Sequence, residues 1–284
     1  MGLRIQNNIE AFNTHRQLTA TSVQASKSME KLSSGYRINR AADDAAGLGI
    51  SEKMRGQIGG LAQAQRNAQD GISLVQTAEG ALSEVHSMLE RVRELKVQLN
   101  NDTLDDNDKN SIGAEVAEIA KEVGSIVNDT AFNGKTVFGA NTFAFQVGAN
   151  DGEVVSMAAA NLNTDRTVGG LSNLISVGVS AASQVAAAMC SGDLAVISDL
   201  DKMIENVSKV RGQYGAIQNR LEHRLANLAT YQENLTASES RIRDVDMAAE
   251  MTKFTKFNIL QQAGTSMLAQ ANQAPQNVLS LLKG

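Results

Sequence analysis

The chain has 284 residues, 42% of them hydrophobic, which suits one or two folded domains and excludes a wholly disordered protein. Trp is absent, aromatic residues make up 4% and there is one Pro, a composition that favours long helices over β-sheets. The single cysteine, Cys190, excludes a disulfide within the chain, and the net charge of −5 combines basic ends with an acidic middle.

Two further classes are disfavoured by the pattern of charge and hydropathy. The positive residues near both ends stand singly among apolar ones, which favours amphipathic helix faces over a nucleic-acid site. No uninterrupted apolar run reaches about 18 residues, so we expect no membrane span. The N-terminus also lacks the apolar segment of a cleavable secretory signal.

The first predicted element is an amphipathic helix within residues 1–40. Ile5, Ile9 and Phe12 share one helical face. A second stripe follows in a shifted phase and consists of Leu18, Ser22, Ala25, Met29, Leu32 and Tyr36. A helix with one narrow apolar stripe is marginal in isolation, so this one needs a partner.

The strongest periodic signal in the chain is a heptad seam, spaced by alternating steps of three and four residues. Its positions are Leu61, Ala64, Ala68, Gly71, Val75, Ala78, Leu82, Val85, Leu89, Val92, Lys96 and Leu99. A seam of this length predicts a long helix packed against another long helix.

Two further helices supply partners for this seam. After an acidic connector at 101–110, the positions Ile112, Val116, Ile119, Val123 and Ile126 repeat at helical spacing. A third seam consists of Ile197, Leu200, Ile204, Val207, Val210, Tyr214, Ile217, Leu221, Leu225, Leu228, Tyr231, Leu235, Ser238, Ile242 and Val245. Together the three seams predict a helical bundle or coiled coil.

The period changes between the second and third helices. Asn133-Gly134 is a type I′ turn signal, and Phe143, Phe145 and Val147 alternate with smaller or polar residues, which predicts a β-hairpin region at about 134–157. The Ala-, Ser- and Gly-rich stretch at 158–194 predicts surface loop and short helix.

The last predicted helix lies within residues 241–284. One stripe along it consists of Phe257, Leu260, Gly264, Met267 and Ala271. Four apolar residues crowd the end of the chain after Pro275, namely Val278, Leu279, Leu281 and Leu282. Like the first helix it has one stripe, so we expect the two terminal helices to pair with each other and with neighbouring subunits.

Residues that carry chemistry do not assemble into a recognisable site. Asp43 and Asp44 are adjacent and point apart on a helix, so a cap or ion-pair role is expected. Asp106, Asp108 and Asn110 resemble the start of a calcium loop but lack its Gly and its closing Glu. The three histidines have no metal-binding spacing. We therefore expect no catalytic residue, cofactor or metal.

Long motifs at both ends resemble the bacterial flagellin family. The segment 32–51, LSSGYRINRAADDAAGLGIS, is similar to its N-terminal signature, and 239–246, ESRIRDVD, with 262–272, QAGTSMLAQAN, and 275–282, PQNVLSLL, to its C-terminal one. The resemblance covers roughly residues 1–150 and 195–284. It implies a mainly α fold: a long antiparallel helical bundle or coiled-coil rod with a small β-hairpin region and paired N- and C-terminal helices.

The resemblance also implies a function and a domain plan. Flagellins are secreted through the flagellum's own export channel and polymerise into the extracellular filament used for swimming. Residues 1–40 with 241–284 would form the terminal coiled-coil domain of the inner tube, and 41–240 the rod, with the reduced variable region at 158–194. Ile5, Ile9, Phe12, Leu260, Met267 and the four C-terminal apolar residues would serve assembly. Implied partners are other subunits, an export chaperone, and the cap and hook-junction proteins.

A further resemblance concerns the segment 89–98, LERVRELKVQ, which is similar to the flagellin segment bound by the host Toll-like receptor for flagellin. Arg91, Leu95 and Gln98 match the contacting positions, and Glu115 matches the supporting acid on the next helix. Steps of four and three would place the first three residues on one side of a helix. Lys96 stands where many relatives have a small residue.

Three alternatives stay open at the level of sequence. A hook–filament junction protein shares helical termini, but the long motifs at both ends favour the filament subunit. A secreted membrane-active translocator would need a strongly apolar pair of helices. A hydrolase in place of the outer domain would need a catalytic constellation between 140 and 195, and none is visible there.

Overall fold

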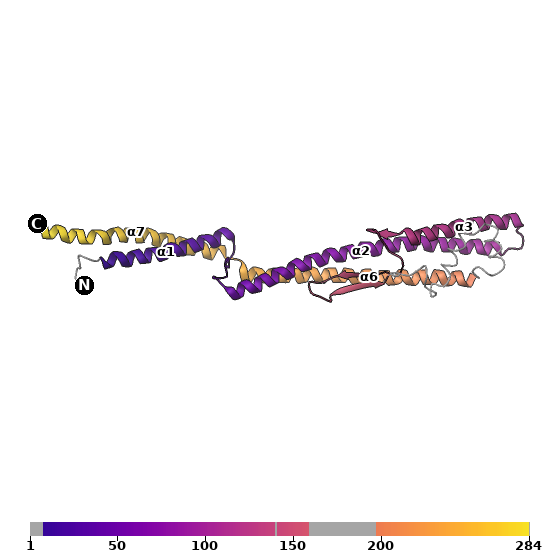
Figure 1. Cartoon of the computed structure of the whole chain (residues 1–284), viewed down its shortest axis with the longest axis horizontal. Helices are drawn as coiled ribbons and strands as arrows, with labels where there is room; N and C mark the ends of the chain where they lie inside the picture. The colour runs from indigo at the N-terminus through magenta and orange to yellow at the C-terminus, as the bar shows by residue number, and fades with distance from the viewer. Residues whose placement is uncertain (1–7, 140, 159–196, 284) are drawn as a thin grey trace. The chain divides into compact units, whose positions relative to one another are not determined.

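The structure, a computed structural model, describes residues 8–139, 141–158 and 197–283, and for 274–283 it describes the backbone alone. The helices are α1 (Ile9–Ser34), α2 (Ala45–Leu99), α3 (Asp106–Asp129), α6 (Ile197–Arg243) and α7 (Met247–Lys283). The strands are β1 (Ala131–Phe132), β2 (Lys135–Thr136), β3 (Thr142–Gln146) and β4 (Val154–Ala158) (Figure 1). Cys190 and the stretch expected to be loop beyond Ala158 lie outside the described residues.

The chain divides into two compact units. The body unit is Ile58–Gln232, and the terminal unit comprises the residues up to Gln57 and from Glu233 onwards. Helices α2 and α6 each contribute residues to both units. The mainly helical fold with a small β region, expected from the sequence, is confirmed.

Helix α2 confirms the heptad seam. All twelve seam positions are buried. They include Gly71, which has no side chain, and Lys96, whose side chain is charged. The helix begins at Ala45, well before the first seam residue. Most of these seam residues belong to the main core cluster together with residues of α3 and α6. Helical periodicity therefore identified the centre of the body unit, because only a stripe repeated every three or four residues stays against one set of partners.

The partner helices follow the predicted seams with local corrections. In α3, Ile119 and Ile126 are half-buried, and the neighbouring Ala120 and Val127 occupy the buried positions instead. The rotation by one residue lets the small alanine approach α2, while the larger isoleucines pack at the margin of the core. In α6, Tyr231 is 45% exposed and does not belong to the packed seam.

The β region consists of two short antiparallel hairpins rather than one. Asn133 and Gly134 both have positive φ, 50° and 76°, as a type I′ turn requires, and they join β1 to β2. In the second hairpin, Phe143 pairs with Met157 and Phe145 with Val155. Phe145 lies over Gly71, where an added Cβ would come within 3.2 Å of the ring. The glycine thus lets the hairpin approach α2 closely.

In the terminal unit, α1 and α7 lie side by side (Figure 1). Near one end of the pair the Asn8 side-chain amide donates to the Ala271 carbonyl at 2.7 Å, and near the other the Ser28 hydroxyl donates to Glu250, also at 2.7 Å. These contacts fix an antiparallel pair and confirm the expected pairing of the terminal helices.

Candidate functional site

The interface between α1 and α7 is narrow and made of small or polar residues. Its most buried members, each less than 9% exposed, are Thr21, Ala25, Ser28, Glu250 and Ala271. At Gly264 an added Cβ would lie 3.1 Å from the Leu18 side chain, so the two backbones approach closely there. Such an interface buries little apolar surface and gives the pair limited stability by itself.

A buried carboxylate sets the relative position of the two helices. Glu250 accepts the 2.7 Å hydrogen bond from Ser28 on one oxygen and a 3.0 Å ion pair from Lys253 on the other. Burial alone would raise the pKa of Glu250, but the hydrogen bonds from Ser28 and Lys253, with the charges of Lys253 and Lys31, outweigh it and lower that pKa. Sliding either helix would leave this charge buried without its partner, which is costly.

Many large apolar residues of both helices are exposed outside this interface, whereas Leu18, Leu32, Phe254, Phe257 and Leu268 are half-buried. Nine large apolar residues in the described part of the pair are between 45% and 72% exposed. In α1 they are Ile9, Phe12, Val23 and Met29, and in α7 they are Met247, Met251, Ile259, Leu260 and Met267. We call this set the outward apolar face. It is the largest group of exposed apolar side chains in the described chain, and such groups mark interaction surfaces.

The structure corrects the stripes expected for the terminal helices. In α7, Gly264 and Ala271 face α1, whereas Leu260 and Met267 are 45% and 59% exposed. In α1 the buried positions include Thr21 and Ser28, and Met29 of the expected stripe is exposed. The reason is that close contact between the two helices favours small side chains and is fixed by the hydrogen bond between Ser28 and Glu250. Apolar size does not decide which face packs.

A shallow hollow lies on the outward apolar face of α7. It is lined by Met251, Thr252, Thr255, Lys256, Ile259 and Leu260. All six residues belong to one helix, so the hollow is the groove between successive side-chain ridges. Such a groove fits a ridge of side chains from another helix.

Four of the nine expected assembly residues are exposed on the terminal helices, and the side chains of the other five lie outside the described residues. Ile9, Phe12, Leu260 and Met267 belong to the outward apolar face. Ile5 lies outside the described residues. The backbone of 278–282 continues α7, but the side chains of Val278, Leu279, Leu281 and Leu282 lie outside the described part.

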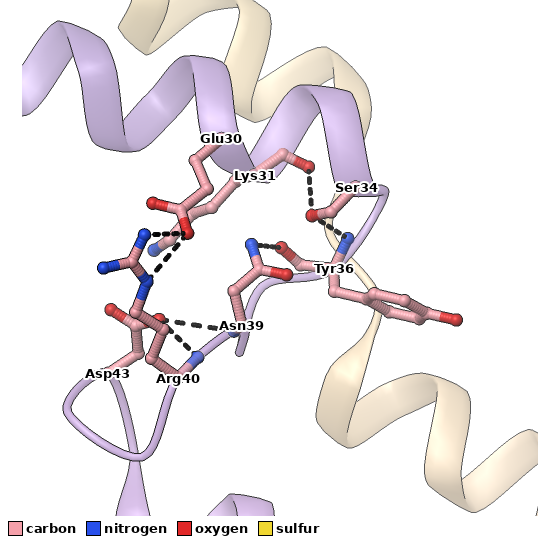
Figure 2. Close-up of polar contacts among 7 residues, drawn as sticks. All are labelled: Glu30, Lys31, Ser34, Tyr36, Asn39, Arg40 and Asp43. Atoms are coloured by element: carbon pink, nitrogen blue, oxygen red, sulfur yellow. Dashed lines mark hydrogen bonds and ion pairs between the residues drawn. The ribbon is translucent and has the colours of Figure 1, made fainter.

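The N-terminal motif folds into the connector between α1 and α2 (Figure 2). Gly35, with φ of 76°, ends α1 by donating its backbone N–H to the Lys31 carbonyl at 2.9 Å. Asp43 accepts backbone N–H bonds from Asn39 and Arg40 at 3.2 and 3.1 Å, and the bond from Arg40 is the main reason that its pKa is lowered. Arg40 in turn pairs with Glu30 at 2.9 Å.

The two connectors of the terminal unit are tied together by Arg243. Its guanidinium lies 4.6 Å from the centre of the Tyr36 ring and pairs with Glu52 at 3.1 Å. Tyr36 also forms a backbone bridge with Asp244. Asp44 accepts from the Gly47 N–H at 2.8 Å and caps the start of α2. Of the two adjacent aspartates, for which a cap or ion-pair role was expected, Asp44 caps a helix and Asp43 accepts backbone N–H bonds within the connector.

The segment resembling a receptor-binding site presents a different arrangement from the one expected. Arg91 on α2 pairs with Glu115 on α3 at 2.7 Å and with Glu94 at 3.1 Å, and Gln98 is exposed. Leu95, however, is only 1% exposed and packs in the core of the body unit. The expectation that it presents its side chain together with Arg91 is wrong for the single chain, because Leu95 lies three residues after Val92 and four before Leu99, both of which are buried.

The residues examined for chemistry are structural in the described chain. Asp106, Asp108 and Asn110 lie in helix α3 rather than in a loop. No group of three or more His, Cys, Asp or Glu residues that could hold a metal ion occurs within residues 8–139, 141–158 and 197–283. None of the helices described is long and apolar enough to cross a membrane.

Comparisons with known proteins agree with the motifs. The model of the bacterial flagellin N-terminal helical region matches residues 5–142, and that of the C-terminal helical region matches 197–282. The chain is 50% identical to a flagellin of Bacillus subtilis (strain 168), with 99% of this chain and 100% of the relative aligned. It is 49% identical to a flagellin of Halalkalibacterium halodurans, with 98% and 99% aligned.

A crystal structure of Bacillus cereus flagellin aligns with a TM-score of 0.47 at 28% identity and covers 57% of this chain and 88% of that one. The identity of about half over nearly full length supports a flagellar filament subunit. From its two family regions and its relatives, the chain belongs to the bacterial flagellin family.

Proposed function

We propose that this flagellar filament subunit polymerises through the outward apolar face of α1 and α7, while the narrow interface between the two helices orients that face. The observation that carries the proposal is the inversion of the usual pattern. Large apolar side chains such as Phe12 and Ile259 face solvent, while Ser28 and Glu250 are buried. Burying one exposed large apolar side chain is worth about 1.5–3 kcal/mol, and polymerisation repeats that gain in every subunit.

The resemblance to flagellins supports further details of this proposal. Residues 1–40 with 241–284 serve as the inner-tube domain, and 41–240 as the rod around it. The subunit is exported from the cell and meets an export chaperone, the cap and the hook-junction proteins on its way. It acts structurally and has no enzyme activity, cofactor, nucleic-acid partner or membrane partner.

The assembly role is tested by placing a charge on the outward apolar face. We expect Leu260→Asp to raise the concentration needed for filament formation by roughly 10- to 150-fold, the equivalent of losing one buried leucine. Asn219→Asp adds the same charge at an exposed polar position of α6 in the body unit and should polymerise normally. Sedimentation and electron microscopy after salt-induced assembly measure both. Equal polymerisation of the two variants would remove the outward apolar face as the interface.

A second candidate role is recognition by the host Toll-like receptor for flagellin. The observation that favours it is the Arg91–Glu115 ion pair, which holds an exposed guanidinium in place on α2, with Gln98 exposed two turns further along. Leu95 contributes from the core by fixing the position of the helix face. The main role of the segment 89–98 is packing of the body unit, and the receptor uses a surface that the fold already holds rigid.

A further inference from the structure

The methionine side chains differ between the two units in exposure. Four methionines of the terminal unit are between 49% and 59% exposed, namely Met29, Met247, Met251 and Met267. The described methionines of the body unit are buried or half-buried, namely Met88, Met157 and Met203. All four exposed methionines belong to the outward apolar face, so the polarisable sulfur atoms accessible to solvent are concentrated on the proposed assembly surface.

Exposed thioethers have a defined reaction with peroxides. A sulfur lone pair attacks one oxygen of hydrogen peroxide, the O–O bond breaks, that oxygen becomes the sulfoxide oxygen, and the second leaves as water after proton transfer. Sulfur loses two electrons and the peroxide gains them, so each methionine consumes one peroxide. The product is a polar side chain with a strong hydrogen-bond acceptor in place of an apolar one.

We propose that Met29, Met247, Met251 and Met267 form an oxidation site through which peroxide controls polymerisation of the subunit. The inference rests on the proposed assembly role of the outward apolar face. A sulfoxide buried there in a subunit contact gives up its hydrogen bonds to water, and burying such a group without full replacement of those bonds is unfavourable. Oxidised subunits therefore remain soluble while their body unit stays folded.

Met251 occupies the most sensitive position of the four. It lines the hollow on α7 together with Ile259 and Leu260, which carry no hydrogen-bond donor. The Thr252 and Thr255 hydroxyls in the same hollow already donate to the Ala248 and Met251 carbonyls, so the Lys256 ammonium is the remaining side-chain donor among the residues lining it. Met247 lies one helical turn before it, on the same side of the helix. A ridge of side chains from a neighbouring subunit that fills this hollow contacts the Met251 sulfur directly. That contact then shields the sulfur from peroxide. Free subunits are sensitive, whereas subunits in a filament are protected.

The test treats purified full-length monomer with hydrogen peroxide, locates the added oxygens by peptide mass spectrometry, and measures polymerisation by sedimentation. We expect the four exposed methionines to react before Met157 and Met203. The concentration needed for filaments should rise roughly tenfold or more, with unchanged melting of the body unit. A variant with leucine at all four positions keeps the apolar face and should polymerise equally well before and after treatment. Met88→Leu is the matched control and should stay sensitive.

The outcomes separate this inference from the proposed function. Normal polymerisation of wild-type protein carrying all four sulfoxides overturns the oxidation site, as does equal loss of polymerisation in the treated four-leucine variant. If that variant fails to fold, Met251→Leu takes its place, and it should retain part of its polymerisation after treatment; no retention overturns the role of Met251. Equal oxidation rates for these methionines in filaments and monomers instead overturn the outward apolar face as the interface.

Discussion

At the scale of single residues, polar groups specify contacts that apolar residues leave undefined. Ser28 and Glu250 come from helices far apart in sequence and meet in a buried hydrogen bond. A buried, satisfied charge contributes less to net stability than to selecting one alignment. Arg91 and Glu115 play a related part at the surface of the body unit, where they link α2 to α3.

Protonation of Glu250 should weaken the α1–α7 pair. Its pKa is lower in the folded state than in the unfolded chain, where a glutamate titrates near about 4.3. The stabilisation is therefore complete above that value and is lost as the pH falls through the folded pKa. As the pH is lowered, circular dichroism of the wild-type monomer should show loss of helix at a higher pH than in the Glu250→Gln variant. That variant keeps an acceptor for Ser28 but has no carboxyl group to titrate at this position. Identical pH profiles of the two proteins would contradict this.

The Arg91 side chain should be required for receptor recognition. Truncation by Arg91→Ala removes the guanidinium that Glu115 and Glu94 hold in place. If Arg91 is a central contact, its loss costs on the order of 1–3 kcal/mol of binding and weakens signalling by monomers accordingly. The control is Lys121→Ala, an exposed cation on α3 that makes only a local ion pair with Glu118. Unchanged signalling by folded Arg91→Ala protein would exclude the assignment.

At the scale of elements, small residues in long helices have distinct tasks. In the 55-residue helix α2, Gly71 lies under Phe145 and beside Leu221, with under 3.4 Å available for a Cβ. Gly80 in the same helix is exposed and has open space around it. The first glycine is required by packing, and the second only weakens the helix.

Substitution at these two glycines should therefore shift stability in opposite directions. Gly71→Leu overpacks the contact between α2, β3 and α6 and should destabilise the body unit by about 1–3 kcal/mol. Gly80→Ala should stabilise it by about 0.5–1 kcal/mol, because alanine is the better helix former. Chemical denaturation measures both changes. A Gly71→Leu protein as stable as the wild type would show that the hairpin can move away without cost.

At the scale of the whole molecule, we propose that folding and polymerisation depend on different parts of the chain. The main core cluster lies within the body unit. The outward apolar face lies in the terminal unit. Its apolar side chains are exposed in the free subunit, so burial does not hold them in place. A subunit built in this way can fold its body before it joins a filament.

Removal of residues 278–284 should abolish filaments and leave the body unit intact. The deleted segment contains Val278, Leu279, Leu281 and Leu282, whose burial against neighbouring subunits would contribute about 1.5–3 kcal/mol each. Melting of the body should barely change, since its core residues all precede this segment. Sedimentation and circular dichroism of the truncated protein measure the two effects together. Normal filaments would argue against terminal assembly, and a much lower melting temperature would place the tail in the body's own core.

Periodicity in the sequence determined the body unit almost completely. The seam of α2 is buried at every predicted position, and the Asn133-Gly134 signal corresponds to a turn with both residues at positive φ. These predictions succeed because a helical stripe and a two-residue turn depend on nearby residues. The motifs at the two ends were likewise sufficient to indicate the family, which the full-length relatives confirm.

Tertiary structure alone decided which faces of the terminal helices pack together. Thr21, Ser28 and Glu250 lie outside the apolar stripes of the sequence, yet they are buried, whereas Leu260 and Met267 of those stripes are exposed. In the body unit, packing with residues of α3 and α6 likewise placed Leu95 in the core. Hydrophobic patterns show that a helix needs a partner, but the shape and hydrogen bonds of that partner determine which side meets it. In this chain close approach favours small residues at the centre of the contact, so large apolar residues such as Phe12 and Ile259 remain exposed.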